Sequence, residues 1–278
     1  MYDKITNHFS TTLHGIDVHY ELYNEEMKNN KPVFVLIHGF LSSTFSFRRL
    51  IPLLSREYTV LALDLPPFGK SGKVREFVYS YDNFANIVIS LLEKLTFQHN
   101  ILIGHSMGGQ VALYVSRKRP DLVYKKVLLS SSGYLPRAKF PLLHSSYLPW
   151  FSTFLKLLLQ FQGVSRNLMR VVHDVSLIDD EMMEGYTTPF YDRNIFDALT
   201  KMVRDREGDL PVQFLKEITT PTLLIWGEQD RIVPLSIGKR LHNDLPYSTF
   251  ISYQNTGHLL PEEQPHQIYE NIIGFAKG

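Results

Sequence analysis

The stretch ILIGHSMGGQVALYVS, residues 101–116, places a serine between glycines where an apolar run meets a helical pattern. Residues 107–118 repeat apolar side chains at helical spacing. Between the two, GHSMG at 104–108 matches the pattern G-x-S-x-G. A strand that turns sharply into a helix crowds its central residue, and flanking glycines remove the side chains that would clash. The pattern predicts that the Ser106 hydroxyl stands at the carboxyl edge of a sheet, beside helix N–H groups that can face an anion.

Similar short apolar runs occur elsewhere in the chain, at residues 33–37, 59–63, 125–130 and 222–226, and more weakly at 248–253. Runs of this length that are rich in Val, Ile and Leu are typical of strands covered on both faces, as in a parallel sheet. Helical patterns lie between them. The sequence therefore predicts an α/β fold with a mostly parallel central sheet flanked by helices.

The helical patterns of this alternating part cover residues 43–56, 82–97, 107–118, 236–245 and 263–276. Before the sheet, residues 4–12 and 16–22 alternate loosely around His14 and Gly15, which predicts a β-hairpin.

The alternation of strand and helix patterns is interrupted once along the chain. Residues 133–215 contain no strand pattern, and their helical stretches are 145–161, 164–174, 179–186 and 192–206. We expect a helical insertion at 133–215 within one core, whose N-terminal part is 1–132 and whose C-terminal part is 216–278.

The balanced charge and the lack of targeting signals argue against nucleic-acid-binding, secreted and membrane-inserted proteins. The 278 residues include 29 basic and 28 acidic ones, for a net charge of +1, so no bulk field draws the chain to nucleic acid. Residues 1–15 are polar, which predicts no secretory signal. No apolar stretch approaches the about 18 residues of a membrane span, so we expect no stable membrane insertion.

The chain has no cysteine, which excludes disulfides, thiolate metal sites and a cysteine nucleophile. This composition fits a reducing compartment, and we expect a cytoplasmic protein, monomeric or homodimeric. There is no His-Glu-x-x-His, Walker A or dinucleotide motif, so we expect neither a metal nor a cofactor.

A serine nucleophile needs a base, and the base needs a group that orients it. Asp230 follows the run at 222–226, and His258 follows the run at 248–253. Open α/β sheets place their sites at these carboxyl ends. We expect Ser106, Asp230 and His258 to act together, with Glu228 left open as a rival acid.

Acyl transfer also needs donors for the developing oxyanion. One expected donor is the backbone N–H of Met107, which follows the serine. The other is the backbone N–H of Phe40, in the loop after 33–37, where Gly39 lets the backbone approach. We interpret His38 as a structural residue that holds this loop.

The chain at this point resembles the α/β-hydrolase superfamily. The matching pieces are HGF (38–40), DLPPFGKS (64–71), GHSMG (104–108), GEQD (227–230) and GH (257–258). The resemblance implies that 104–108 is the family's nucleophile elbow and that 133–215 is a cap over the active site. Epoxide hydrolases and haloalkane dehalogenases of this shape carry Asp where this chain has Ser106, so the resemblance disfavours both classes of enzyme.

The resemblance implies a serine carboxylesterase whose small-molecule substrate is an ester. Residues 147–161 are strongly apolar. We expect this stretch to pack on the core and partly line an acyl pocket, with Phe40, Trp150 and Phe154 binding a small to medium apolar acyl group.

Two alternatives remain open. A C–C bond hydrolase or a lactonase would use the same three residues, because their chemistry also starts from an activated serine. A non-catalytic receptor on this fold would bind a ligand without reacting with it.

Overall fold

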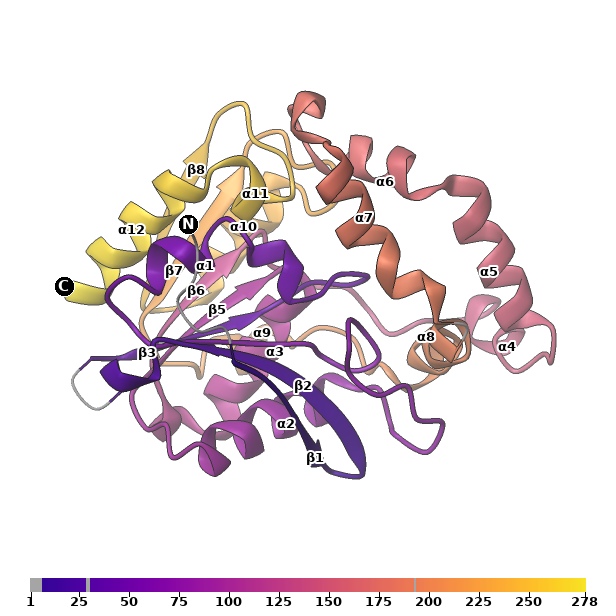
Figure 1. Ribbon diagram of the computed structural model, residues 1–278, viewed down its shortest axis with the longest axis horizontal. Coiled ribbons are helices and arrows are strands. Elements are labelled where there is room, and N and C mark those ends of the chain that lie inside the picture. Colours follow the sequence, from indigo (N-terminus) through magenta and orange to yellow (C-terminus); the bar gives the residue numbers. More distant parts are fainter. Residues whose placement is uncertain (1–6, 29–30, 193) are drawn as a thin grey trace.

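The computed structural model describes residues 7–28, 31–192 and 194–278. Its centre is an eight-stranded sheet in the order β1-β2-β4-β3-β5-β6-β7-β8 (Figure 1). The strands are β1 (Asn7–Leu13), β2 (Ile16–Tyr23), β3 (Val33–Ile37), β4 (Val60–Leu63), β5 (Asn100–His105), β6 (Val123–Leu129), β7 (Thr222–Gly227) and β8 (Ser248–Tyr253). β1 pairs with β2 and β2 with β4 in the antiparallel sense, and all other neighbours are parallel. The predicted mostly parallel sheet is confirmed.

The predicted hairpin is β1 and β2, and residues 4–6 of its predicted first strand lie outside the described residues. One predicted helix is wrong as a single element. Residues 43–56 form a 3₁₀ turn, η2 (Thr44–Phe47), and then a short helix, α1 (Ile51–Leu54). Pro52 explains the break, because it has no N–H to donate and its ring would clash with the preceding helical turn.

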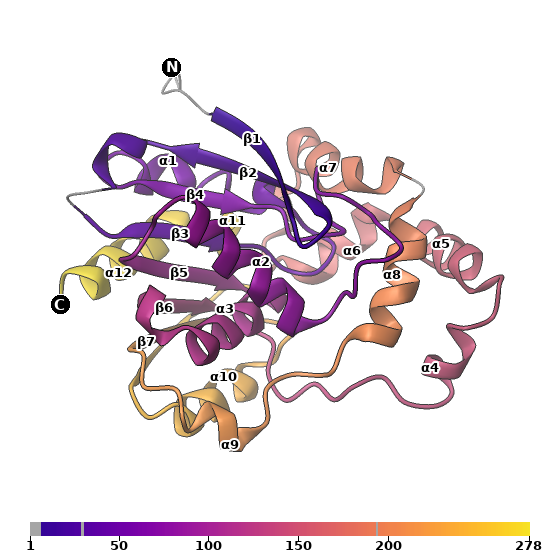
Figure 2. The same cartoon turned by 90° about the horizontal axis from the view of Figure 1, so that it is seen from below.

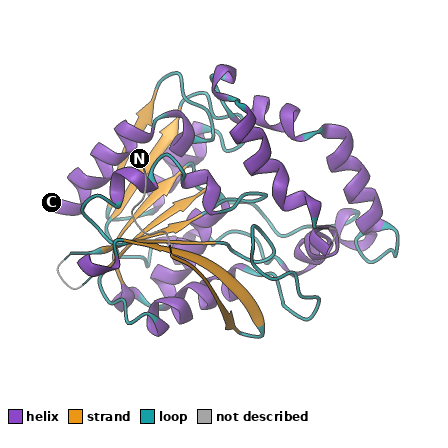
Figure 3. Cartoon of the chain, viewed as in Figure 1, coloured by secondary structure: helices purple, strands orange, loops and turns teal. Residues whose placement is uncertain are grey.

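Helices cover both faces of the sheet (Figures 1 and 3). One layer contains α2 (Tyr81–Lys94), α3 (Met107–Lys118) and α10 (Leu235–Asp244), and the other contains α1, α11 (Leu260–Glu263) and α12 (Pro265–Lys277). β3 serves both layers because its side chains alternate: Val35 packs in the α2–α3 cluster, and Leu36 packs in the α12 cluster. This two-sided burial is why the central strands are continuous apolar runs.

The segment between β6 and β7 is helical. Its elements are α4 (Leu142–Ser145), α5 (Phe151–Gln162), α6 (Val164–Val171), α7 (Asp180–Thr187), α8 (Asn194–Asp205) and α9 (Val212–Leu215). The inserted helices α4–α8 stand beyond the carboxyl ends of the parallel strands in both views (Figures 1 and 2). Shorter 3₁₀ turns are η1 (Glu25–Met27), η3 (Pro120–Leu122), η4 (Val175–Leu177) and η5 (Thr188–Tyr191).

The two legs of this insertion are joined at its base. The Asp209 N–H donates to Leu135 O at 2.8 Å, and Pro136 and Gly208 form an isolated antiparallel bridge. The Asp209 carboxylate in turn accepts from the Leu135 N–H and the Ser132 hydroxyl. The chain therefore leaves and re-enters the core as a paired neck.

No helix among the described residues is both long enough and apolar enough to cross a membrane.

Candidate active site

Ser106 lies between β5 and α3 with backbone angles φ 52° and ψ −117°. This conformation is unusual for a residue with a side chain and stores strain. Bonds on both sides hold it: the Ser106 N–H donates to Leu129 O at 3.0 Å, and Ser106 O accepts from the Ser132 N–H at 3.0 Å. The turn is thus fixed by the end of β6, the neighbouring strand.

The glycines around Ser106 are required by space. A Cβ built at Gly104 would lie 2.5 Å from Gly108 O, and one built at Gly108 would lie 2.1 Å from Ile37 O. Both contacts are with backbone, which cannot move aside. The spacing of glycines in the sequence is therefore explained by the close approach of α3 to β5 and β3.

His258 and Asp230 form a buried pair. His258 Nδ1 lies 2.7 Å from Asp230 Oδ2. The other carboxylate oxygen accepts the N–H groups of Ile232 at 2.8 Å and Val233 at 2.9 Å. Since Asp230 accepts at Nδ1, the proton of a neutral His258 is held there, and Nε2 is left with its lone pair.

The carboxylate of Asp230 is kept ionised. Burial favours the neutral acid, but the hydrogen bond and charge of His258 outweigh burial and hold the pKa of Asp230 below its usual range. The Val233 N–H acts in the same direction. Asp230 can therefore accept from His258 and stabilise a positive imidazolium.

The rival acid lies elsewhere. Glu228 is exposed, and its Oε1 accepts from the Ser252 hydroxyl at 2.9 Å. Of the two acids in the loop after β7, the structure brings Asp230 to His258.

Two further histidines lie near the serine: His105 precedes it and also lines the cavity above it, and His38 lies in the loop after β3. His38 Nδ1 donates to Gly39 O at 2.7 Å, and its Nε2 accepts from the Leu65 N–H at 2.9 Å. Burial lowers the pKa of His38, so both bonds come from a neutral ring that ties two loops together. His105 donates from Nε2 to His258 O at 2.8 Å, and burial lowers its pKa to about 3. It thereby fixes the backbone of His258.

The two expected oxyanion donors lie on either side of the serine. Met107 is the first residue of α3, where helix N–H groups lack an intrahelical acceptor. Phe40 follows Gly39, at which a built Cβ would lie 3.0 Å from Ser106 Cβ. The loop after β3 therefore passes directly over the serine.

A cavity of about 700 Å³ opens over these groups. Core residues Phe40, Ser106 and His258 form its floor, and the inserted helices supply the opposite wall. That wall includes Leu159, Gly163, Val164, Asn167, Leu168, Tyr186, Thr187, Phe190, Tyr191 and Phe196. Among the described lining residues there is no Lys, Arg, Asp or Glu. The cavity thus places Ser106 and His258 opposite a largely apolar wall.

Two predicted substrate contacts do not line this cavity. Trp150 and Phe154 are 55% and 49% exposed and pack edge to face on each other. α5 turns a different face inward, since Phe151 is buried and Leu155 and Leu159 pack against the core. Phe151, Leu155 and Leu159 recur every four residues and form one face of the helix. Trp150 and Phe154 have the same spacing but lie one position earlier, so they form the neighbouring, exposed face.

The wall residues of α6, α7 and η5 were not anticipated from the sequence. Their helices are individually amphipathic, but which apolar side chains reach the serine depends on how the helices cross one another. Of the predicted substrate contacts, Phe40 lines the cavity.

Known proteins share both sequence and fold with this chain. A family model described as the α/β-hydrolase fold matches residues 32–265. "Uncharacterized hydrolase YugF" of Bacillus subtilis (strain 168) is 51% identical over 266 residues, which cover 96% of each chain. A 2-hydroxy-6-oxononadienedioate/2-hydroxy-6-oxononatrienedioate hydrolase of Cupriavidus pinatubonensis is 28% identical over 286 residues, covering 97% of this chain and 95% of its own.

Among solved structures, the epoxide hydrolase CorEH superposes with a TM-score of 0.80 at 20% identity, covering 98% of each chain. That likeness is one of fold alone. The family match over most of the chain and the half-identical hydrolase agree with the eight-stranded sheet and its serine turn. The chain belongs to the α/β-hydrolase family and is a hydrolase.

Proposed function

We propose that this hydrolase cleaves carboxylic esters of small to medium apolar acyl groups through an acyl-enzyme on Ser106. The observation that carries the proposal is the 2.7 Å contact between His258 Nδ1 and Asp230 Oδ2, at the floor of a cavity that Ser106 also lines. The inserted helices of 133–215 act as the cap that completes this cavity.

In the first step Ser106 Oγ attacks the ester carbonyl while His258 Nε2 takes the hydroxyl proton. Asp230 holds the imidazole in this tautomer and stabilises the imidazolium that forms. The carbonyl oxygen becomes an oxyanion, which the N–H groups of Phe40 and Met107 bind. When the tetrahedral intermediate collapses, His258 returns the proton to the leaving alcohol, and the acyl group stays on Ser106.

In the second step water attacks the acyl-enzyme. His258 takes a proton from the water, and the same two N–H groups stabilise the second oxyanion. Collapse releases the carboxylic acid and restores the Ser106 hydroxyl with the proton held by His258. Over the two steps one ester and one water are consumed, one alcohol and one carboxylic acid are released, and the groups of the chain are regenerated.

The cavity wall supports the choice of substrate class. Its apolar side chains favour an uncharged acyl chain, since a carboxylate moved there would lose water without meeting a cation. The alternative of C–C bond hydrolysis draws support from the 28% identical relative, whose named substrate is a dioate and so carries two carboxylates. A cavity without Lys or Arg among its described lining residues fits an uncharged ester better.

The test is a fluorophosphonate probe together with p-nitrophenyl esters of increasing acyl length. The wild-type chain is expected to label and to hydrolyse acyl esters. Ser106→Ala is expected to lose labelling and to lower turnover by about 10⁶. Equal turnover by Ser106→Ala would refute the acyl-enzyme, and a chain that neither labels nor turns over esters would be a binding protein.

A further inference from the structure

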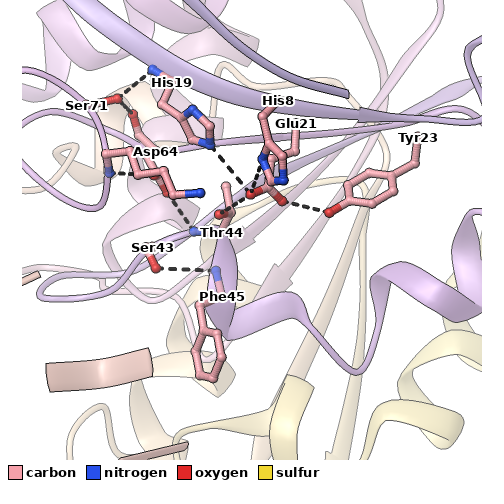
Figure 4. A network of polar contacts seen from close by, with 10 residues as sticks. His8, His19, Glu21, Tyr23, Ser43, Thr44, Phe45, Asp64 and Ser71 are labelled. Carbon is pink, nitrogen blue, oxygen red and sulfur yellow. Dashed lines mark hydrogen bonds and ion pairs between the residues drawn. The ribbon is translucent and has the colours of Figure 1, made fainter. Parts of the chain in front are cut away.

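Three side chains of the kinds that bind metal ions lie together on the N-terminal hairpin. His8 comes from β1, and His19 and Glu21 come from β2 (Figure 4). The register places His8 directly opposite Glu21, and His19 lies two residues before Glu21 on the same strand face. None of the three lines the cavity of the proposed active site.

The three potential ligand atoms converge on one point. His8 Nδ1 lies 3.3 Å and His19 Nε2 lies 3.5 Å from Glu21 Oε1, and the ligand atoms all lie within 4.8 Å of one another. Tetrahedral Zn²⁺ with bonds of about 2.0–2.1 Å separates its ligands by about 3.3 Å. The two contacts to the carboxylate therefore have the length of an edge of such a tetrahedron.

The surroundings of His19 Nε2 are a second observation that points to a bound ion. The residue is only 6% exposed, and its Nε2 makes no hydrogen bond among the described residues; it faces Glu21 Oε1 at an ion-pair distance of 3.5 Å. A buried polar atom without a partner costs free energy, so native proteins rarely keep one. A cation between His19 Nε2 and Glu21 Oε1 would replace this long contact by coordination of both groups.

The Glu21 carboxylate is held in its orientation by two hydroxyl groups. The Tyr23 hydroxyl donates to Glu21 Oε2 at 2.7 Å, and the Thr44 hydroxyl donates to Oε1 at 3.3 Å (Figure 4). Second partners of this kind are what hold metal ligands in place in proteins. The His8 side chain is 51% exposed, so an ion can reach the group from solvent.

We propose that His8, His19 and Glu21 form a binding site for Zn²⁺, with water as a fourth ligand. Two imidazoles and a carboxylate are a ligand set suited to zinc. Among the described residues, β1 is an edge strand of the sheet and pairs with β2 alone. A bound ion would join these two strands through side chains and so stabilise the folded chain relative to the unfolded one.

The test is titration of the metal-stripped full-length chain with Zn²⁺ by calorimetry, together with its melting temperature. All proteins carry His258→Ala, which removes the competing pair of His258 and Asp230. One Zn²⁺ per chain is expected, with a rise in melting temperature. His8→Ala and Glu21→Gln are each expected to weaken binding by about ten-fold or more and to remove that rise.

The matched control is His266→Ala, which removes an exposed histidine of α12 and is expected to change nothing. His8 is itself half exposed, so its loss leaves the fold intact, as circular dichroism would report. The visible spectrum of bound Co²⁺ gives a second readout of coordination. A parent that binds no Zn²⁺, or a His8→Ala variant that binds as tightly as its parent, would overturn the proposal.

Discussion

His258 Nδ1 lies 2.7 Å from Asp230 Oδ2, whereas Glu228, two residues before Asp230, hydrogen-bonds to Ser252. Both acids lie in the loop after β7, and His258 follows β8, the next strand along the chain. The difference arises because Asp230 is buried in the loop and receives the N–H groups of Ile232 and Val233, while Glu228 remains exposed at its start. One loop therefore holds one acid that pairs with His258 and another that faces solvent.

The first prediction concerns these two acids. Asp230→Asn is expected to lower the turnover of a p-nitrophenyl ester by about 10⁴, because an amide NH₂ facing Nδ1 favours the wrong tautomer of His258. Glu228→Gln is the matched control and is expected to keep wild-type turnover. Steady-state kinetics measure both, and the reverse order of effects would assign the role to Glu228.

The second prediction concerns the cavity wall. Leu159 lines the cavity from α5, whereas Leu157 on the same helix is 60% exposed and lies outside it. Leu159→Trp is expected to lower kcat/KM for the longest accepted acyl chain by about ten-fold or more, with little change for an acetyl ester. Leu157→Trp is expected to leave the acyl-length profile unchanged. Identical profiles for the two variants would exclude this wall from substrate binding.

The third prediction concerns the fit of α3 against β3. Gly108→Ala would place a Cβ 2.1 Å from Ile37 O, and it is expected to lower the free energy of unfolding. Overpacking of this kind costs about 1–3 kcal/mol or more.

The control for Gly108→Ala is Gly274→Ala in α12, where a Cβ would meet nothing within 4 Å. That change is expected to raise the free energy of unfolding by about 0.5–1 kcal/mol, since alanine favours a helix over glycine. Urea unfolding measures both, and equal effects of the two variants would contradict the close approach of α3.

The fourth prediction concerns Lys126, a fully buried residue of β6 whose Nζ donates to Thr220 O at 3.1 Å. Burial lowers the pKa of Lys126 to about 7. The unfolded chain keeps this proton up to about pH 10.4. Between these values the unfolded state binds more protons, so the contribution of Lys126 to the free energy of unfolding rises with pH.

Lys126→Met is therefore expected to be most stabilising, relative to the parent, below pH 7. The advantage should shrink as pH rises toward 10, where the parent's lysine is neutral in the fold. Subtracting the two urea-unfolding free energies at pH 6, 8 and 10 isolates the effect from other groups. A difference that does not change with pH would contradict the assigned burial of a charge.

The sheet and its polar loops could be predicted because each depends on local sequence. Every central strand is a short apolar run, and the carboxyl ends of parallel strands meet at one edge. Ser106, Asp230 and His258 could therefore be assigned to one rim from their places after β5, β7 and β8. Pro52 is itself a local signal, yet the sequence pattern predicted residues 43–56 as one helix and missed the break.

The residues of the insertion that line the cavity could not be predicted in the same way. Trp150 and Phe154 belong to the same apolar stretch as Leu159, and composition does not say which face of a helix turns inward. That choice is made by the packing of α5 on α8 and on the core. The cluster of His8, His19 and Glu21 similarly requires the pairing register of β1 with β2, which a loose alternation predicts only in outline.

The paired neck at Leu135 and Asp209 has an evolutionary consequence. Because the insertion starts after β6 and finishes before β7, which are adjacent parallel strands, exchanging it for another segment would keep the order of the strands in the sheet. The wall that the insertion contributes to the cavity and the floor that carries Ser106 and His258 are therefore encoded in separate stretches of the gene. Recombination between relatives at this neck is expected to change the substrate preference of a hydrolase while Ser106, Asp230 and His258 stay unchanged.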